Sequence, residues 1–375
     1  MKKVVIAIDS FKGCLPSAEA GKAAAEGIRS VYPECEVICL PIADGGEGML
    51  DVLIMATNGQ EVPISAHDPL MRWRNTYYGI SENEETAFIE MASISGLPLV
   101  PPERRNPMLT TTYGTGEIIR DALERGCRNF IIGIGGSATN DAGLGMLQAL
   151  GFRFSDKEGK EVGTGRGEVL IKVAYIDSTF VHPALNSCRF TVACDVQNPF
   201  YGPEGAAYVF APQKGADREM VEALDAGLQN FAEVIRHTTG KDISHHPGAG
   251  AAGGMGGSLL AFLNAELKPG IQLMLEALDF SNKIKSADLI ITGEGKADRQ
   301  TLMGKVPSGI LAEARKQNIP VILLAGNIED SDELQQAGFE GVFSVNPPFI
   351  SLEEAMRPEV ARKNIQQTVE SICKK

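Results

Sequence analysis

Short apolar runs alternate with helix-length segments near the N-terminus of the chain. Residues 4–8 are five apolar residues in succession, and residues 17–31 follow with apolar and alanine positions at helical spacing. A second candidate strand occupies residues 36–40, and residues 49–57 again fit a helix. Strands that alternate with helices are typical of a parallel sheet covered by helices. This part of the chain is therefore predicted to begin an α/β domain.

The pattern changes near residue 65 and returns near residue 284. Residues 76–80 and 86–91, separated by an acidic turn, predict a β-hairpin. Further strands are predicted at 130–134 and 190–194, and a long helix at 217–238. After residue 284 the strand and helix order resumes, with strands at 289–292, 320–324 and 341–345 and a closing helix at 353–373.

We therefore predict an α/β protein of two domains. Residues 1–64 and 284–375 would form a discontinuous, Rossmann-like domain with a parallel sheet, and residues 65–283 would form a second α/β domain inserted into it. The length of 375 residues agrees with this division, because single hydrophobic cores stop growing near ~250–300 residues. A cleft between two such domains is a usual place for a small ligand.

Composition narrows the function classes. The net charge of −13 argues against a nucleic-acid or anionic-membrane surface, because both carry negative charge. Seven cysteines, an odd number without a Cys-x-x-Cys pair, indicate reduced thiols, and the five histidines have no zinc-ligand spacing. The N-terminal segment fits a first strand and is too short for a signal peptide. We expect a cytoplasmic protein that acts on a small molecule, with no nucleic-acid or membrane partner.

Charged side chains follow the predicted strands of the Rossmann-like domain. The run 289–292 leads directly into Gly293, Glu294, Lys296 and Asp298. Two other strands end in the same way, in Asp9, Ser10 and Lys12 and in Asp44, Gly45 and Gly46. Ligands of open parallel sheets bind at the carboxyl ends of the strands. A single Asp there is usually a cap or a turn former. Capping alone does not account for four of them at predicted strand ends: Asp9, Asp44, Asp298 and Asp195, which follows the run 190–194.

Two glycine-rich loops could bind an anion through backbone N–H groups. The loop from Gly135 to Asp141 follows a predicted strand, precedes a helix and adds a hydroxyl donor at Ser137. The loop 248–257 contains Gly253 and Gly254 and also opens a helix, but it follows Ser-His-His-Pro rather than a strand, which argues against a dinucleotide fingerprint. Close helix packing through small residues is the alternative for this second loop.

The residue types fit phosphoryl transfer. That reaction needs carboxylates to hold Mg²⁺ and to orient or deprotonate the attacking hydroxyl, together with cations that offset phosphate charge. Lys12, Lys296 and Lys305 could supply the cations. The P-loop motif is absent, since Gly304-Lys305 is followed by Val306 and has no upstream glycine at the required spacing.

The motifs taken together resemble the type I glycerate kinases of bacteria. The resemblance rests on a series of segments in order along nearly the whole chain: Asp9–Lys12, Ala43–Gly48, Phe88–Ala92, Gly114–Glu117, Ile132–Asp141, Ala193–Val196, Asn198-Pro199, Gly248–Gly256 and Thr292–Gly295. It implies transfer of the γ-phosphoryl group of ATP to D-glycerate with Mg²⁺, by two α/β domains of which one is inserted in the other. Bacterial members are generally assigned 2-phospho-D-glycerate as product. The segment Thr164–Leu170 departs from the family's glycine-rich run.

These observations give a set of expected site residues. We expect the general base at Asp195, with Asp298 and Asp44 as the next candidates, and Mg²⁺ ligands at Asp44 and Glu294. Contacts to substrate or nucleotide are expected at Asp9, Ser10, Lys12, Gly45, Gly46, Gly135, Gly136, Ser137, Asp141, Gly253, Gly254, Gly293, Glu294, Lys296 and Lys305.

Two other functions fit the same residues. One is a kinase for a related hydroxy acid or sugar acid, because a small cleft discriminates by few contacts. The other is a binding module for such an acid that has lost catalysis. The four carboxylates at strand ends argue against the module, because a sensor does not need them.

Overall fold

The computed structural model describes residues 1–46 and 48–374, so Glu47 of the predicted Ala43–Gly48 motif lies outside the described part. The chain forms two compact units. The terminal unit consists of Met1–Asp44 and Ile271–Lys375, and the inserted unit consists of Gly45–Gly270. Each has its own sheet.

These boundaries correct the sequence-based ones at 64/65 and 283/284. Helix α2 (Met49–Ala56) packs against strands of the inserted unit, and β3 (Gln60–His67) pairs with β4 (Trp73–Ile80) along its whole length. Both elements therefore belong to the inserted unit. At the other boundary, the side chain of Ile271 contacts Gly309 in the terminal unit, so α9 (Gly270–Ala277) belongs there.

The terminal unit has a five-stranded parallel sheet in the order β2-β1-β11-β12-β13. Its strands are β1 (Lys3–Ile8), β2 (Glu36–Cys39), β11 (Leu289–Ala297), β12 (Val321–Ile328) and β13 (Gly341–Ser344). Counted within this unit, the order is 2-1-3-4-5, the flavodoxin-like arrangement, in which the chain reverses direction across the sheet between β1 and β11. Ligands of such sheets bind at the carboxyl ends of the two strands beside this switch point.

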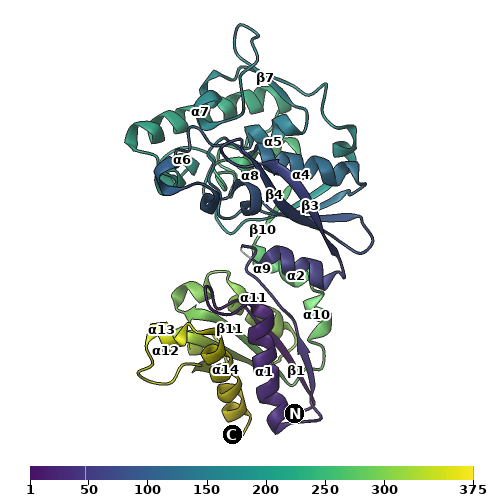
Figure 1. Ribbon diagram of the computed structural model, residues 1–375, viewed down its shortest axis with the longest axis vertical. Helices are drawn as coiled ribbons and strands as arrows, with labels where there is room; N and C mark the ends of the chain where they lie inside the picture. The colour runs from purple at the N-terminus through teal and green to yellow at the C-terminus, as the bar shows by residue number, and fades with distance from the viewer. Residues whose placement is uncertain (47, 375) are drawn as a thin grey trace. The chain divides into compact units, whose positions relative to one another are not determined.

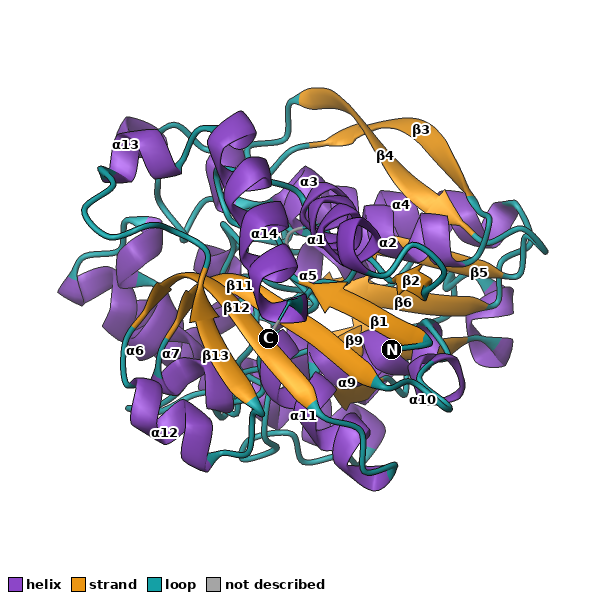
Figure 2. Ribbon diagram, turned by 90° about the horizontal axis from the view of Figure 1, so that it is seen from below, coloured by secondary structure: helices purple, strands orange, loops and turns teal. Residues whose placement is uncertain are grey.

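Helices cover both faces of this sheet (Figure 2). Alternate residues of β1, such as Ile6 and Ile8, point to the face covered by α1 (Ser17–Val31) and α14 (Pro358–Cys373). Helix α11 (Val306–Lys316) covers the other face together with α9. The remaining helices of the unit are short: α10 (Phe280–Lys283), α12 (Ser331–Gln336) and α13 (Leu352–Ala355).

The inserted unit has a mixed six-stranded sheet in the order β10-β9-β6-β5-β4-β3. The pairs β3–β4 and β4–β5 are antiparallel, which confirms the predicted hairpin, and the remaining pairs are parallel. Its further strands are β5 (Thr86–Glu90), β6 (Asn129–Gly133), β9 (Arg189–Ala193), β10 (Glu266–Lys268) and a separate pair, β7 (Arg153–Ser155) with β8 (Tyr175–Asp177).

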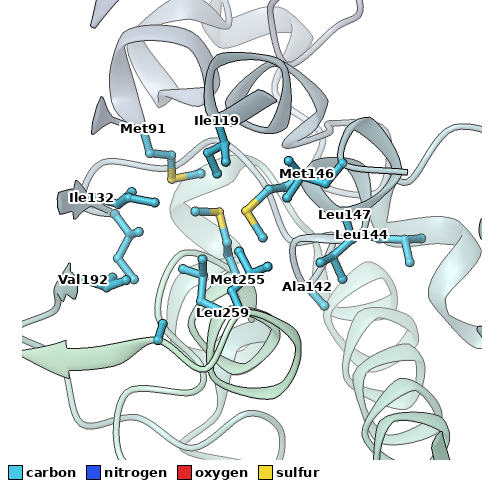
Figure 3. Packing of buried hydrophobic residues seen from close by; sticks show 14 of the residues in the cluster. Met91, Ile119, Ile132, Ala142, Leu144, Met146, Leu147, Val192, Met255 and Leu259 are labelled. Atoms are coloured by element: carbon cyan, nitrogen blue, oxygen red, sulfur yellow. The ribbon is translucent and has the colours of Figure 1, made fainter. Parts of the chain in front are cut away.

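A large apolar cluster fills much of the inserted unit. Figure 3 shows Met91, Met146 and Met255 directed toward one another among branched side chains of the sheet and of neighbouring helices. Methionine suits such a junction because its flexible thioether fills irregular gaps. The helices of the unit, most of them labelled in Figure 1, are α2, α3 (Ala92–Ser95), α4 (Tyr113–Glu124), α5 (Leu144–Ala149), α6 (Ala206–Phe210), α7 (Arg218–Thr239) and α8 (Met255–Phe262). No helix within the described ranges combines the length and the apolar character needed to cross a bilayer.

Candidate active site

The switch point of the terminal unit brings two acidic side chains together. Ile8 of β1 is paired with Gly293 of β11, and the N–H of Asp9 donates to the carbonyl oxygen of Gly293 at 2.8 Å. Asp9 therefore follows β1, and Glu294 lies beside it in β11, just beyond the part of β11 that pairs with β1. Both are buried, with 6% and 7% of their surface exposed. Gly293 itself is required by packing, because a Cβ atom there would lie 2.5 Å from the carbonyl oxygen of Leu324.

A cavity of about 310 Å³ opens at this point and is lined entirely by residues of the terminal unit. Its polar lining contains seven of the residues predicted from the sequence, together with Asn327 and Asn346 from the ends of β12 and β13. The seven are Asp9, Ser10, Lys12, Asp44, Glu294, Lys296 and Lys305. The strand-end pattern thus predicted residues that the fold gathers around one space.

Three lysines line this cavity, and two of them lie near its carboxylates. The Nζ atom of Lys12 lies 3.8 Å from Asp44 Oδ2, and that of Lys305 lies 3.7 Å from Glu294 Oε2. Both distances exceed those of a good hydrogen bond, so these ammonium groups are held electrostatically and can turn toward a ligand. Lys296 is more firmly held, at 3.0 Å from Glu329 Oε2 and 3.4 Å from Asp298 Oδ2.

Burial raises the pKa of the two buried carboxyl groups. Burial raises the pKa of Asp9 to about 7, and the negative charge of Asp44 acts in the same direction, while the Ser10 N–H and Lys12 oppose it. Burial also raises the pKa of Glu294, against the hydrogen bond from Thr301 and the charge of Lys305. A carboxyl group with a pKa near neutrality can both take up and release a proton at neutral pH, which suits a general base.

Asp298 has a local structural role. Its carboxylate accepts the N–H of Gln300 at 2.9 Å, and its own N–H donates to Thr301 Oγ1 at 2.9 Å. This is a capping box around the short turn Arg299–Leu302. The hydroxyl of Thr301 then donates to Glu294 Oε1 at 2.6 Å. Asp298 thus fixes the residue that orients Glu294. The sequence reasoning missed Thr301, although the Asp-x-x-Thr spacing is a recognisable capping signal.

The pKa of Asp298 agrees with this role. Partial burial would raise it, but the Gln300 N–H and the ammonium of Lys296 hold the pKa of this carboxyl below its usual range. A carboxylate that is stabilised in its charged form is a weak proton acceptor. Asp298 is therefore better suited to positioning than to base catalysis.

Four of the predicted residues of the inserted unit lie on the loop after β6: Gly135, Gly136, Ser137 and Asp141. Asp141 is fully buried and accepts hydrogen bonds from the N–H and the hydroxyl of Thr112, both at 2.8 Å, and from the N–H groups of Gly143 and Gly145 at 3.2 Å. Burial raises the pKa of Asp141, and these hydrogen bonds oppose it. Its side chain links two loops and has no oxygen left exposed to a ligand.

Ser137 of the same loop is held by a buried lysine. Lys214 Nζ donates to Ser137 Oγ at 2.7 Å and to the carbonyl oxygen of Thr139 at 2.6 Å. Burial lowers the pKa of Lys214 to about 7, although the charge of Asp141 opposes this. The sequence reasoning missed Lys214, because nothing in its sequence context distinguishes it from a surface lysine.

The remaining predicted residues occupy other places. Asp195 follows β9 and accepts the N–H of Gly270 at 2.9 Å, so it lies in the inserted unit. Gly45 and Gly46 lie between Asp44 and α2. Gly135 and Gly136 precede Ser137, and no atom lies within 4 Å of a Cβ built on Gly135.

Gly253 and Gly254 open α8, and the close contacts there support the packing alternative. A Cβ atom on Gly253, whose φ is +68°, would lie 2.1 Å from the carbonyl oxygen of Thr139. We expect Gly253→Ala to lower the free energy of unfolding by roughly 1–3 kcal/mol, measured by urea unfolding. The matched variant Gly135→Ala should change it by less than ~0.5 kcal/mol. A Gly253→Ala protein that keeps its stability and loses its activity would contradict packing and favour ligand contact.

No group of three or more His, Cys, Asp or Glu side chains within residues 1–46 and 48–374 is arranged to hold a metal ion by itself. Magnesium often needs fewer protein ligands, because it binds one or two carboxylates together with substrate phosphates and water. Asp44 and Glu294 fit that pattern: both are hard oxygen donors lining one cavity, and the charge of Asp44 raises the pKa of Glu294. A bound cation would relieve this repulsion.

Comparisons with known proteins agree with the site. The model of the glycerate kinase family matches residues 4–375. A Bacillus subtilis (strain 168) protein named glycerate kinase is 46% identical over 372 residues, which cover 99% of this chain and 97% of the relative. An Escherichia coli (strain K12) protein named glycerate 2-kinase is 47% identical over 356 residues, which cover 95% and 93%.

A solved structure supports the same conclusion. The crystal structure assigned as glycerate kinase 2 of Salmonella typhimurium LT2 has a TM-score of 0.91 to this chain, at 44% identity, and the match covers 100% of this chain and 97% of that one. The resemblance inferred from the motifs is confirmed, as is the α/β fold class. The chain belongs to the glycerate kinase family and is a kinase.

Proposed function

We propose that this kinase transfers the γ-phosphoryl group of ATP to the 2-hydroxyl of D-glycerate, giving 2-phospho-D-glycerate and ADP. The observation that carries the proposal is the cavity at the switch point, where three carboxylates and three lysines meet. The choice of the 2-hydroxyl is supported by the Escherichia coli relative, which is named glycerate 2-kinase and is 47% identical. The runner-up product is 3-phospho-D-glycerate.

We propose Asp9 as the general base, in place of Asp195. The hydroxyl oxygen of glycerate forms a bond to the γ-phosphorus, the bond from that phosphorus to the bridging oxygen breaks, and ADP leaves. The hydroxyl proton passes to the carboxylate of Asp9, which is buried, lines the cavity and has a pKa of about 7. Asp44 and Asp195 remain the alternatives.

The other residues would bind and orient. Lys12, Lys296 and Lys305 offset the charge of the phosphate groups, as phosphoryl transfer requires. Asp44 and Glu294 would hold Mg²⁺ together with phosphate oxygens, and the ion would supply further neutralisation of phosphate charge. Ser10, Gly135, Gly136 and Ser137 stay proposed ligand contacts. We assign Asp141, Gly253, Gly254 and Gly293 to supporting these loops and strands, and Gly45 and Gly46 to the turn beside Asp44.

The cellular setting of the proposal is the cytoplasm, where ATP is available. All seven cysteines are unpaired, as is usual for proteins of a reducing compartment.

The identity of the product tests the proposal. We expect ADP release with D-glycerate, and a phosphorus resonance in NMR that couples to the single proton on C2. Coupling to the two protons on C3 would show 3-phosphorylation and overturn the proposed product. ADP release with L-glycerate or glyoxylate but not with D-glycerate would overturn the proposed substrate.

A further inference from the structure

The cavity of the terminal unit is lined by apolar as well as charged side chains, and we call the part beside the apolar ones its apolar half. The apolar side chains come mainly from the loop after β1, the residue after β13, and the segment that contains α13, and they include Phe11, Val345, Leu352, Ala355 and Met356. D-glycerate has seven non-hydrogen atoms, four of them oxygens, and gains little from such a wall. The cavity volume of about 310 Å³ leaves room beyond a molecule of that size. A larger ligand with an apolar part fits it better.

The rim of this apolar half carries exposed apolar side chains. Leu352 is 79% exposed and Met356 is 38% exposed, and the neighbouring Phe349 is fully exposed. Phe349 also has a φ of +67°, in the left-handed region that bulky residues rarely adopt. Unfavourable backbone conformations concentrate at ligand clamps. The segment 347–356, which we call the rim segment, is therefore suited to cover a ligand.

Two glycines also line this cavity, next to Phe11. Gly295 and Gly326 lie against each other, and a Cβ atom on Gly326 would lie 2.7 Å from the carbonyl oxygen of Gly295. Glycine has no side chain, so neither residue fills the cavity between the charged and the apolar lining residues. One elongated ligand, charged at one end and apolar at the other, can therefore occupy both.

An amide side chain lies on the wall of the cavity. Asn327 lines it from the end of β12, is exposed, and has no side-chain hydrogen bond to any described residue. The carboxamide of asparagine offers one donor and one acceptor, the pattern that complements N7 and the N6 amino group of adenine. On the same edge guanine presents two acceptors, N7 and O6, so it cannot satisfy the amide oxygen.

We propose that the apolar half of this cavity binds the adenine and ribose of ATP, with Asn327 reading the adenine edge and the rim segment covering the base. The triphosphate then extends past Gly295 and Gly326 toward Lys12, Lys296 and Lys305. This assignment rests on the proposed function only in taking ATP as the phosphoryl donor. It places the nucleotide in the terminal unit.

The experiment measures binding, which needs no turnover. Dissociation constants for adenosine, for a non-hydrolysable ATP analogue, for inorganic tripolyphosphate and for D-glycerate are measured by calorimetry on the full chain. The variants are the double substitution Leu352→Ala/Met356→Ala and, as a matched control, Met55→Ala, which truncates a methionine that is 59% exposed on α2 of the inserted unit.

We expect the dissociation constants for adenosine and the ATP analogue to rise at least tenfold in the double variant. The dissociation constants for tripolyphosphate and D-glycerate should stay within twofold of the wild-type values. Met55→Ala should change none of them. Weaker D-glycerate binding with unchanged adenosine binding would overturn the proposal, as would a wild-type protein that does not bind adenosine. If glycerate is not phosphorylated but adenosine binding still depends on the rim, the proposed function fails and this inference stands.

Base selection gives an independent test. The wild type should bind ATP at least tenfold more tightly than GTP. Asn327→Asp should reduce that preference by weakening the binding of ATP, because an ionised carboxylate accepts hydrogen bonds but cannot donate one to N7. A preference for ATP that is unchanged in Asn327→Asp would overturn the role of Asn327 in reading the base. Far-ultraviolet circular dichroism and melting temperature establish that each variant is folded.

Discussion

Replacing Asp9 by asparagine is expected to lower kcat/KM for D-glycerate about 10²–10⁴-fold, the usual loss for a general base. Asparagine keeps the shape of the side chain and the oxygen that accepts the Ser10 N–H at 2.7 Å. It cannot take up the proton of the attacking hydroxyl. Steady-state kinetics with ATP and D-glycerate measure the loss, and the Kd for the ATP analogue should stay within a few-fold.

Two matched variants identify the base. Asp298→Asn should lower kcat/KM for D-glycerate by less than about tenfold. Its carboxamide oxygen can still accept the Gln300 N–H and keep the turn that holds Thr301 against Glu294. Asp195→Asn tests the assignment made from the sequence. If Asp195→Asn loses activity 10²-fold or more while Asp9→Asn keeps more than a tenth, the base lies in the inserted unit and our assignment of Asp9 is wrong.

The same Asp9→Asn variant should be more stable than the wild type at pH 8. The pKa of Asp9 is about 7 in the folded protein against 3.8 for the ordinary group. Between these values the folded state holds a proton that the unfolded state releases, so rising pH destabilises the fold until the cost is complete above pH 7. Asparagine removes this cost, so the free energy of unfolding of the variant at pH 8 should be higher by roughly 1–3 kcal/mol, the usual cost of an uncompensated buried polar or charged group.

Urea unfolding without ATP and Mg²⁺ measures this effect at pH 5 and pH 8. The stability gain of the variant over the wild type should be larger at pH 8 than at pH 5. Equal gains at both values would show that the carboxyl of Asp9 is not destabilised by burial, and the argument for its raised pKa would fail.

The sequence allowed the terminal unit to be predicted well, because its strands contain continuous apolar runs followed by charged residues, although β11 continues through its charged residues to Ala297, beyond the predicted end at 292. Buried parallel strands must be apolar along their whole length, so β1 and β11 were recognisable. The polar residues that follow them had to meet at one sheet edge. This reasoning found Asp9, Asp44 and Glu294, which line one cavity.

Strand β3 was not predicted from the sequence, and the reason is physical. It is the edge strand of the inserted unit, mostly exposed or half-buried, and it contains Pro63. Proline is tolerated only where one side of a strand needs no hydrogen bond, as at an edge. The segment therefore lacks the apolar run that identifies a buried strand, and the predicted domain boundary at 64/65 fell inside β3 rather than before it.

The role of Lys214 was not predicted, because the sequence alone does not show that a polar side chain is buried. Lysine is almost never fully buried unless it is paired, and here the partners are Ser137 Oγ and the Thr139 carbonyl oxygen, 77 and 75 positions away. Only the fold brings them together. For the same reason the role of Asp141, which joins Thr112 to the loop after β6, could not be separated from ligand binding in the sequence.

Lys214 gives the second large expected effect, on the pH dependence of stability. Its pKa is about 7 in the folded protein against 10.5 for the ordinary group. Between these values the unfolded state holds a proton that the folded state lacks, so this residue makes stability rise with pH, and its cost is complete below pH 7. One such group contributes up to about 1.4 kcal/mol per pH unit.

Lys214→Met removes the titrating group. We expect the free energy of unfolding of the wild type, minus that of the variant, to increase by about 1 kcal/mol or more for each pH unit from 8 to 10. The hydrogen bonds lost to Ser137 and Thr139 shift the absolute stability by roughly 1–3 kcal/mol, but they do so equally at each pH. The slope therefore reports on the proton alone, and chemical denaturation at several pH values measures it.

Ser137→Ala is the matched control, because it removes one hydrogen-bond partner and leaves the lysine buried. It should be less stable than the wild type and keep the same slope. If Lys214→Met and the wild type have equal slopes, Lys214 keeps its proton in the folded protein, and its burial is offset by the oxygens around it. In that case the lysine would present a permanent positive charge beside Ser137, and the loop after β6 would attract anions at every pH in the range.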